Sequence, residues 1–288
     1  ALGLILILTF RDKKKAHGQV FFSYILWYSF GRFFLEGMRQ PEYILHITKN
    51  IGVSQLLAAI LVIVCVFVII YLGKNKKIVH ADGIIFDLDG TMWDATETIT
   101  EPWNAAAREY NIETHFCQKD IMSIMGLTID EIGEKLFSNV PEDTRKKLLK
   151  RATVLEAEEL EKHGGKLYPK LSETLGELAL KYRLFIVSNC EDGYIECFLK
   201  CSGLGRLFSD YEYIGRTGLQ KSENIKLVAE RNGLKNAVYV GDTKKDMLSA
   251  KAAGTGFIHA AYGFGKIDES VIRAESFEQI PKLIPFFE

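Results

Sequence analysis

The chain has 288 residues, of which 48% are hydrophobic and 25% are charged, and its formal net charge is -1. Charges of both signs are interspersed and no stripe combines basic with aromatic residues, which excludes an electrostatic surface for nucleic acid. The five cysteines lack the paired short spacings of a zinc site or a disulfide framework, which indicates a reducing compartment. Nearly all the long apolar runs precede residue 73, so we expect two parts in different solvents.

Three apolar stretches occupy the first part of the chain. Residues 56–72 are uninterrupted by charge and come close to the roughly 20 residues that cross about 30 Å of hydrocarbon, so we predict a transmembrane helix there. Residues 18–35, rich in Phe, Tyr and Trp, are a second candidate span, with a buried or interfacial helix as the alternative. Residues 1–10 are typical of the end of a third span, and we expect the chain to be a piece of a longer protein.

Two basic runs, RDKKK at 11–15 and KNKK at 74–77, predict the orientation of these helices. Basic loops mark the cytoplasmic side of a membrane. With two spans between the runs, both runs lie on that side, and everything after about residue 78 is cytoplasmic. We therefore expect a multi-pass protein of the bacterial inner membrane with a cytoplasmic soluble domain.

Arg32, Glu36 and Arg39 follow one helix face at the outer end of the second stretch. A juxtamembrane ladder of ion pairs is one explanation, and a lipid site is the other, because charge in a membrane is costly unless it is paired or functional. The segment GQVFFSYILWYSFGRFFLEGMRQP, followed by VSQLLAAIL, resembles the C-terminal part of prolipoprotein diacylglyceryl transferase over about the first quarter of the chain.

That resemblance implies a membrane lipid as a partner of the N-terminal part, with its phosphate held by an arginine of this charged face. The transferase family also carries a His-Gly-Gly region in an N-terminal half that this sequence lacks, and His17-Gly18 does not replace it. We therefore expect no lipid transfer by this piece alone, although the complete protein is a candidate transferase with an accessory second domain.

The remainder of the chain alternates short apolar runs with helical patterns. The runs GIIFDL, RLFIVS, AVYVG and TGFIHA predict strands of a doubly wound parallel α/β sheet. Residues 97–167 contain amphipathic helix patterns and no strand signal, which predicts an inserted helical cap. The expected domains are transmembrane helices at 1–73, a linker at 74–82, a core at 83–96 and 168–288, and the cap.

The first predicted strand ends in two carboxylates, Asp87 and Asp89, before a Gly90-Thr91 turn. One aspartate can attack phosphorus and the second can protonate the leaving oxygen. A common turn or a fragment of a calcium loop is the alternative explanation of Asp-x-Asp-Gly. Ligands of this fold class bind beyond the carboxyl ends of the strands, where this motif lies.

Three further strand ends carry polar side chains. Ser188 and Asn189 can hold phosphate oxygens or simply cap a helix, and Lys221 can bind phosphate or be a solvated lysine. Asp242 and Asp246 can hold a divalent cation or cap the following helix. Each signal is weak alone, but the ordered set favours one site.

The ordered set resembles the haloacid dehalogenase superfamily of phosphohydrolases over residues 80–288. The resemblance implies that Asp87 is the nucleophile, that Asp89 is the acid and base, and that Mg²⁺ is held by Asp87, the main-chain carbonyl of Asp89, and Asp242. It also implies that Ser188 and Lys221 bind the phosphoryl group. The substrate is then a small phosphorylated metabolite.

Further roles follow from the same resemblance. Thr91 and Asn189 belong to the phosphate-binding loops, and Asp246 supports Lys221 or the metal. The family often has Lys-Pro where this chain has Lys221-Ser222, so Arg216 is an alternative to Lys221. The helical insert resembles the caps of the phosphoglycolate phosphatase and β-phosphoglucomutase group.

Three functions remain open for the soluble domain. We expect a phosphatase, because Asp89 is present and no set of cap cations is suited to a bisphosphate. A phosphomutase is the alternative within the same family. An idle binding module is the least supported, because every carboxylate of the motifs is present.

Overall fold

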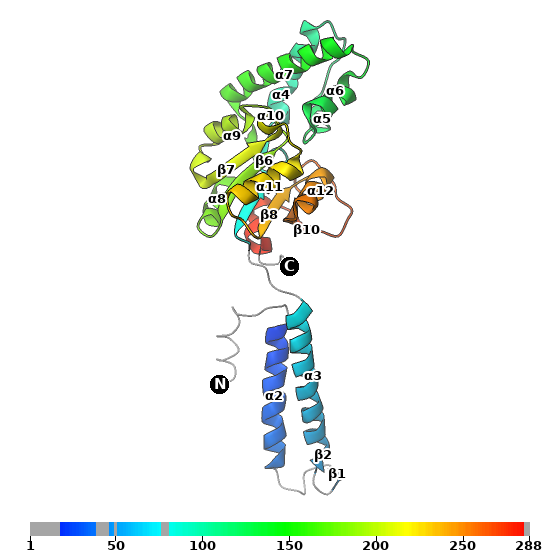
Figure 1. The fold of residues 1–288 in the computed structure, drawn as a ribbon, viewed down its shortest axis with the longest axis vertical. Helices are drawn as coiled ribbons and strands as arrows, with labels where there is room; N and C mark the ends of the chain where they lie inside the picture. Colours follow the sequence, from blue (N-terminus) through cyan, green and yellow to red (C-terminus); the bar gives the residue numbers. More distant parts are fainter. Residues whose placement is uncertain (1–17, 39–45, 49–50, 76–80, 285–288) are drawn as a thin grey trace. The chain divides into compact units, whose positions relative to one another are not determined.

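The structure is a computed structural model, and it describes residues 18–38, 46–48, 51–75 and 81–284. The chain divides into two compact units, one that ends at Val79 and one that runs from His80 to Phe287 (Figure 1). Each unit contains its own secondary structure.

The first unit is a pair of helices, α2 (Gln19–Gly37) and α3 (Val53–Asn75), which pack side by side (Figure 1). The short antiparallel strands β1 (His46–Thr48) and β2 (Ile51–Gly52) lie between them in the sequence. Apolar side chains of α3 point outward, and Phe67 is 69% exposed. Such exposure is costly in water, so this surface suits a lipid environment.

Among the described residues, one helix is long and apolar enough to cross a membrane, over Val53–Tyr71. The helix predicted at 56–72 is therefore present within α3. The second candidate, 18–35, is helical as α2. Its hydropathy is lowered by Arg32, Glu36 and its Tyr and Trp residues. That α2 crosses a membrane is therefore still a prediction. The candidate at 1–10 lies outside the described residues.

The second unit is built on a six-stranded parallel sheet in the order β10-β9-β8-β3-β6-β7. The strands are β3 (Gly83–Phe86), β6 (Arg183–Ser188), β7 (Phe208–Tyr213), β8 (Ala237–Gly241), β9 (Gly256–Ala260) and β10 (Ile272–Ala274). The chain moves from β3 to β6 on one side and later to β8 on the other. This change of direction beside β3 opens a crevice at the carboxyl ends of the strands.

Helices cover both faces of the sheet, as the predicted doubly wound fold requires (Figure 1). They are α8 (Leu171–Ala179), α9 (Tyr194–Ser202), α10 (Ile214–Thr217), α11 (Lys221–Arg231), α12 (Lys244–Ala253) and α13 (Ile280–Leu283), with 3-10 turns at Gly205–Leu207 and Phe277–Gln279. Alternate residues of the central strand point to opposite faces. Ile84 and Phe86 accordingly join one core cluster and Ile85 the other.

The cap is the set of helices α4 to α7 at one end of the sheet (Figure 1). Its members are α4 (Thr96–Glu109), α5 (Gln118–Met122), α6 (Ile129–Phe137) and α7 (Glu142–His163). The long helices α4 and α7 pack against each other around buried Trp103 and Leu148. The prediction of helices between the first two strands of the sheet is confirmed.

Four strands of the second unit were not predicted from the sequence, nor were β1 and β2 of the first. The strand β7 reads FSDYEY and lies at an edge of the sheet, so it has no continuous apolar run. The strand β10 has three residues. In addition β4 (Trp93–Asp94) and β5 (Lys166–Leu167) form a two-stranded antiparallel pair that joins the two ends of the cap insertion, so the expectation of no strand within 97–167 was wrong.

Candidate active site

The crevice contains Asp87 at the end of the central strand. Asp87 follows β3 directly, and its amide donates a hydrogen bond to Val240 O at 2.8 Å, which ties this loop to β8. The loop then turns at Gly90, where φ is 74°. A Cβ atom at Gly90 would lie 2.3 Å from Asp242 Oδ2. Glycine therefore satisfies both the positive φ and the close approach of the two loops.

Lys221 joins two buried carboxylates across the crevice. Its Nζ lies 2.9 Å from Asp87 Oδ1 and 2.6 Å from Asp246 Oδ1, and its side chain is 4% exposed. Burial lowers the pKa of this amine, but Asp246 and Asp87 more than offset that effect, so the pKa of Lys221 is raised well above its ordinary value. Lys221 is a fixed positive charge beside Asp87.

Arg216, the alternative to Lys221, is bound elsewhere. Its Nε donates to Glu212 Oε1 at 2.6 Å, and its guanidinium lies 4.7 Å from the centroid of the Tyr213 ring. The structure therefore brings Lys221, and not Arg216, to Asp87.

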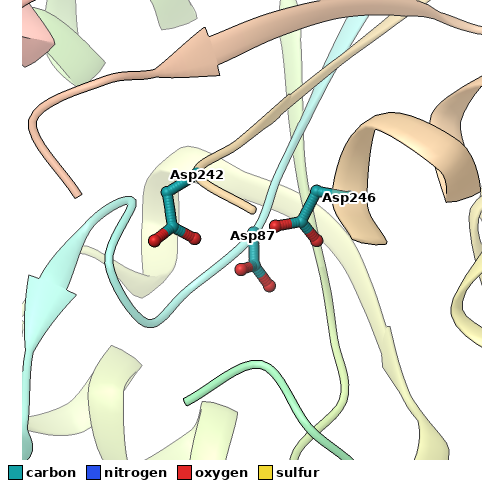
Figure 2. Close-up of side chains that lie close together, drawn as sticks. All are labelled: Asp87, Asp242 and Asp246. Atoms are coloured by element: carbon teal, nitrogen blue, oxygen red, sulfur yellow. The ribbon is translucent and has the colours of Figure 1, made fainter. Parts of the chain in front are cut away.

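Three carboxylates of the crevice converge, as Figure 2 shows, with Asp87 between Asp242 and Asp246. One oxygen of each lies within 4.8 Å of the others. Burial raises the pKa of Asp242 well above its ordinary value, and the charges of Asp246 and Asp87 add to this, against hydrogen bonds from the amides of Phe264 and Gly265. The single positive charge of Lys221 does not neutralise the three carboxylates.

The unequal partners of these carboxylates show which of them could hold a cation. Asp242 Oδ2 accepts from the amides of Phe264 and Gly265, whereas Asp242 Oδ1 is buried with no hydrogen-bond partner. Both oxygens of Asp246 are used, one by Lys221 and the other by Thr243. Asp87 and Asp242 therefore fit a hard divalent cation such as Mg²⁺, which prefers oxygen ligands, while Asp246 holds Lys221 and caps α12.

Asp89 lies in a different environment from Asp87. Its Oδ1 accepts hydrogen bonds from Tyr194 OH at 2.8 Å and from Trp93 Nε1 at 3.0 Å. Burial raises the pKa of Asp89 to about 8, and the charge of Asp87 contributes, although the Tyr194 hydrogen bond opposes the shift. Burial likewise raises the pKa of Asp87, to about 6, against the charge of Lys221. This upward shift of the pKa favours the protonated form of Asp89, which can donate a proton.

The remaining candidates for phosphate binding lie around this centre in different ways. Ser188 is buried at the end of β6 and lines the cavity beside Asp87. Asn189 also lines it, but its side-chain amide donates to Gly126 O of the cap at 3.1 Å, so the side chain links cap and core. Thr91 is fully buried in the turn and does not line the cavity.

Comparison with known proteins extends these observations. Residues 84–260 match the family described as haloacid dehalogenase-like hydrolase. The chain belongs to this family. Its fold is similar to that of a predicted phosphoglycolate phosphatase from Haemophilus somnus, with 24% identity and a TM-score of 0.63 over 70% of this chain and 97% of the other. A predicted phosphatase from Clostridium acetobutylicum has 20% identity and a TM-score of 0.61 over 72% and 99%.

Residues 1–71 match a second family, prolipoprotein diacylglyceryl transferase. The transferase of Enterococcus faecalis is 41% identical over 81 residues, which are 27% of this chain and 28% of that protein. The transferase of Listeria welshimeri is 44% identical over 70 residues, 24% of each. The chain thus spans about a quarter of the length of these relatives. Both resemblances seen in the sequence are confirmed, and the chain is a fusion of a haloacid dehalogenase-like hydrolase with a transferase fragment.

The charged face of the fragment is only partly described. Arg32 Nε lies 3.8 Å from Glu36 Oε2, and its guanidinium donates to Tyr28 OH at 3.4 Å. Arg39 lies outside the described residues. Arg32 and Glu36 form the predicted pair along one helix face.

In this member of the hydrolase family, a cavity of about 690 Å³ extends from Asp87 and Asp89 into the cap. Its cap walls are mainly apolar, and include Ile99, Trp103 and Leu149. The arrangement joins a reactive centre in the core to a larger chamber for the rest of a substrate.

Three residues of this site were not predicted from the sequence, namely Trp93, Tyr194 and Glu156. Trp93 and Tyr194 donate to Asp89, and their rings pack edge to face with centroids 5.6 Å apart. Glu156 lines the cavity from α7. The position of Trp93 four residues after Asp89 was an available signal, whereas nothing in the sequence connects Tyr194 or Glu156 to the motifs.

Proposed function

We propose that the second unit is a Mg²⁺-dependent phosphomonoester hydrolase that works through an aspartyl-phosphate intermediate. The observation that carries the proposal is the meeting of Asp87 and Lys221, 134 residues apart in the sequence, with Nζ 2.9 Å from Oδ1. A carboxylate beside a fixed buried cation is suited to attack an anionic phosphoryl group, which would otherwise repel it.

Two transfers complete the reaction. In the first, a carboxylate oxygen of Asp87 forms a bond to phosphorus, the bond from phosphorus to the ester oxygen breaks, and Asp89 gives its proton to that oxygen. In the second, water attacks phosphorus, Asp89 takes a proton from the water, and the bond to Asp87 breaks. Inorganic phosphate is released and both aspartates return to their starting states.

The other residues have supporting roles in this proposal. Lys221 neutralises charge on the phosphoryl oxygens, and Ser188 donates a hydrogen bond to one of them. Asp246 keeps Lys221 in place. Asp87, Asp242 and the main-chain carbonyl of Asp89 would hold Mg²⁺, which supplies positive charge for the phosphoryl group.

The test is phosphate release from a panel of phosphorylated metabolites by the full chain in detergent micelles with Mg²⁺. The proposal expects turnover by the wild type and none by Asp87→Asn. Label from a substrate phosphoryl group that survives a brief acid quench on the wild type and is released by hydroxylamine, but is absent from the variant, would support the covalent intermediate. A folded wild-type protein that releases no phosphate from any member of the panel would overturn the proposal.

We also propose that the N-terminal unit anchors this hydrolase in the bacterial inner membrane, with both α2 and α3 crossing it and the hydrolase in the cytoplasm. The exposed apolar side chains on both helices, such as Phe34 and Phe67, support a lipid environment. A lipid phosphate is the proposed partner of Arg32. Labelling of a cysteine placed at Glu42, reached only from the cytoplasmic side, would contradict this topology.

A further inference from the structure

The cavity is lined by more acidic than basic side chains, which does not suit a substrate whose organic part is anionic. Apart from the two catalytic aspartates, four carboxylates line it, namely those of Asp130, Glu156, Glu191 and Asp192. Two lysines, Lys146 and Lys150, are its cationic lining residues, and both are exposed. Among the carboxylates, Asp130 and Asp192 are also exposed, whereas Glu156 and Glu191 are half-buried. Lys146 is also paired with Glu142 at 2.6 Å. Negative charge therefore exceeds positive charge around the organic part of any substrate.

Glu156 is one of the two half-buried carboxylates of this lining. It is half-buried on α7, and its Oε2 accepts a hydrogen bond from Trp103 Nε1 on α4 at 2.6 Å. Among the described residues its other oxygen accepts no hydrogen bond, so it can accept one from a ligand. Burial raises the pKa of Glu156 to about 7, and the charge of Glu191 contributes. A positively charged ligand would offset this cost of ionisation.

A second carboxyl group of the lining, that of Glu191, is also in an environment that disfavours its ionised form. Burial raises the pKa of Glu191 above its ordinary value, and the charges of Asp130 and Asp192 add to this. The surfaces between these groups are apolar, with Ile124 and Leu127 on the cap side. The cavity thus combines apolar walls with carboxylates that outnumber the lysines of its lining.

On the basis of the proposed function, we propose that the substrate is the phosphomonoester of an amino alcohol, with an apolar carbon skeleton, a protonated amine that binds Glu156, and no second anionic group. The phosphoryl group then lies at Asp87 and Lys221, and the carbon skeleton lies along the apolar cap walls. A carboxylate or a second phosphate in place of the amine would face Glu156 and Glu191, at a cost that like charges impose in a partly buried site.

The test compares three esters of one chain length with the full chain in detergent micelles and Mg²⁺. They are an unbranched alkyl phosphate, the ω-aminoalkyl phosphate and the ω-carboxyalkyl phosphate, and the comparison is repeated over several chain lengths. All three leave as primary alcohols, so differences in kcat/KM report recognition of the far end. We expect the amino ester to exceed the alkyl ester by about tenfold at its best length, or about 1.4 kcal/mol, and the carboxy ester to be the slowest.

The variant Glu156→Gln identifies the residue responsible. It keeps an acceptor for Trp103 but loses the charge, so the ratio of kcat/KM for the amino ester to that for the alkyl ester should fall toward one. Using a ratio within one variant removes any general effect on catalysis. Glu158→Gln, on the same helix but outside the cavity lining, is the matched control and should keep the wild-type ratio.

Three outcomes overturn the inference. Equal hydrolysis of the three esters by the wild type would show that the cavity does not select charge. Faster hydrolysis of the carboxy ester would show that the exposed lysines hold an anion instead. Failure to hydrolyse any phosphomonoester would remove the proposed function itself, and the inference with it. In the first two cases phosphate is still released, so failure of the inference is distinguishable from failure of the proposed function.

Discussion

The two units place their apolar and charged residues in opposite ways. In the hydrolase unit, Ile84, Ile85 and Phe86 of the central strand are fully buried. In the helical unit, Phe67 is 69% exposed, and the buried carboxylate Glu36 lies near Arg32. Hydrophobic side chains face the interior of the hydrolase unit, whereas those of α3 in the helical unit face outward. Burial stabilises a fold in water, and an apolar outward surface suits contact with lipid.

The comparison also shows where chemistry can occur. The hydrolase unit gathers three buried carboxylates and a buried lysine from the ends of two strands and the first turns of two helices. Such a set is stable only when its charges are satisfied by one another or by a cation. We therefore expect the reaction to depend strongly on the hydrolase unit and weakly on the helices.

The largest effect is expected from the nucleophile. Asp87→Asn should reduce kcat for phosphomonoester hydrolysis by more than about a thousandfold, because the amide cannot form the covalent intermediate. Steady-state phosphate release from the full chain measures it. Arg32→Ala, in the helical unit, is the matched control and should keep near wild-type turnover. Comparable losses of kcat in the two variants would show that the reaction depends on both units.

Tyr194→Phe should affect substrates unequally. Without the Tyr194 hydroxyl, Asp89 is oriented by Trp93 alone. Alkyl phosphates, whose leaving oxygens need a proton, should therefore lose about tenfold in kcat/KM, which reports the first transfer and not the later hydrolysis of the aspartyl phosphate. An ester with a good leaving group, p-nitrophenyl phosphate, should lose less than about twofold. Tyr211→Phe removes a hydroxyl that binds Glu196 at 3.0 Å and serves as the control. Equal losses on both substrates would indicate a general structural defect.

The cation site predicts a change in stability that does not depend on turnover. Mg²⁺ at about a hundred times its Kd should stabilise the hydrolase unit by about 2.7 kcal/mol, because the ion binds the folded state. Asp242→Asn should remove most of that shift, since the buried Asp242 Oδ1 would no longer be anionic. Thermal unfolding with and without Mg²⁺ measures it, with the exposed Asp143→Asn as control. A full shift in Asp242→Asn would place the cation elsewhere.

Deletion of residues 1–78 is expected to have the smallest effect. The hydrogen bonds of Asp87, Asp89 and Lys221 all lie within the hydrolase unit, so kcat/KM on a soluble substrate should change by less than about tenfold. The same assay on the full chain in micelles is the reference. A larger drop in a deletion that unfolds cooperatively would show that the helical unit shapes the active site.

The order of residues along the chain determined much of this structure. Short β-branched runs followed by helical patterns predicted the parallel sheet, because strands buried on both faces need continuous apolar sequence. The parallel arrangement then required the ends of the strands to meet at one edge, which placed Asp87, Ser188 and Asp242 together. The apolar run of α3 was equally clear, because crossing lipid requires length and the absence of charge.

Tertiary structure alone decided which side chains bind one another in the site. Lys221 and Arg216 were both candidates by sequence, and the choice depended on α11 starting where Nζ reaches Asp87 and Asp246. The environment of Asp89 depended on Tyr194, which is 105 residues away in the chain. Likewise Glu156 joins the cavity only because α7 packs on α4. Periodicity and spacing report local geometry, whereas contacts between distant segments arise only when the packed core brings them together.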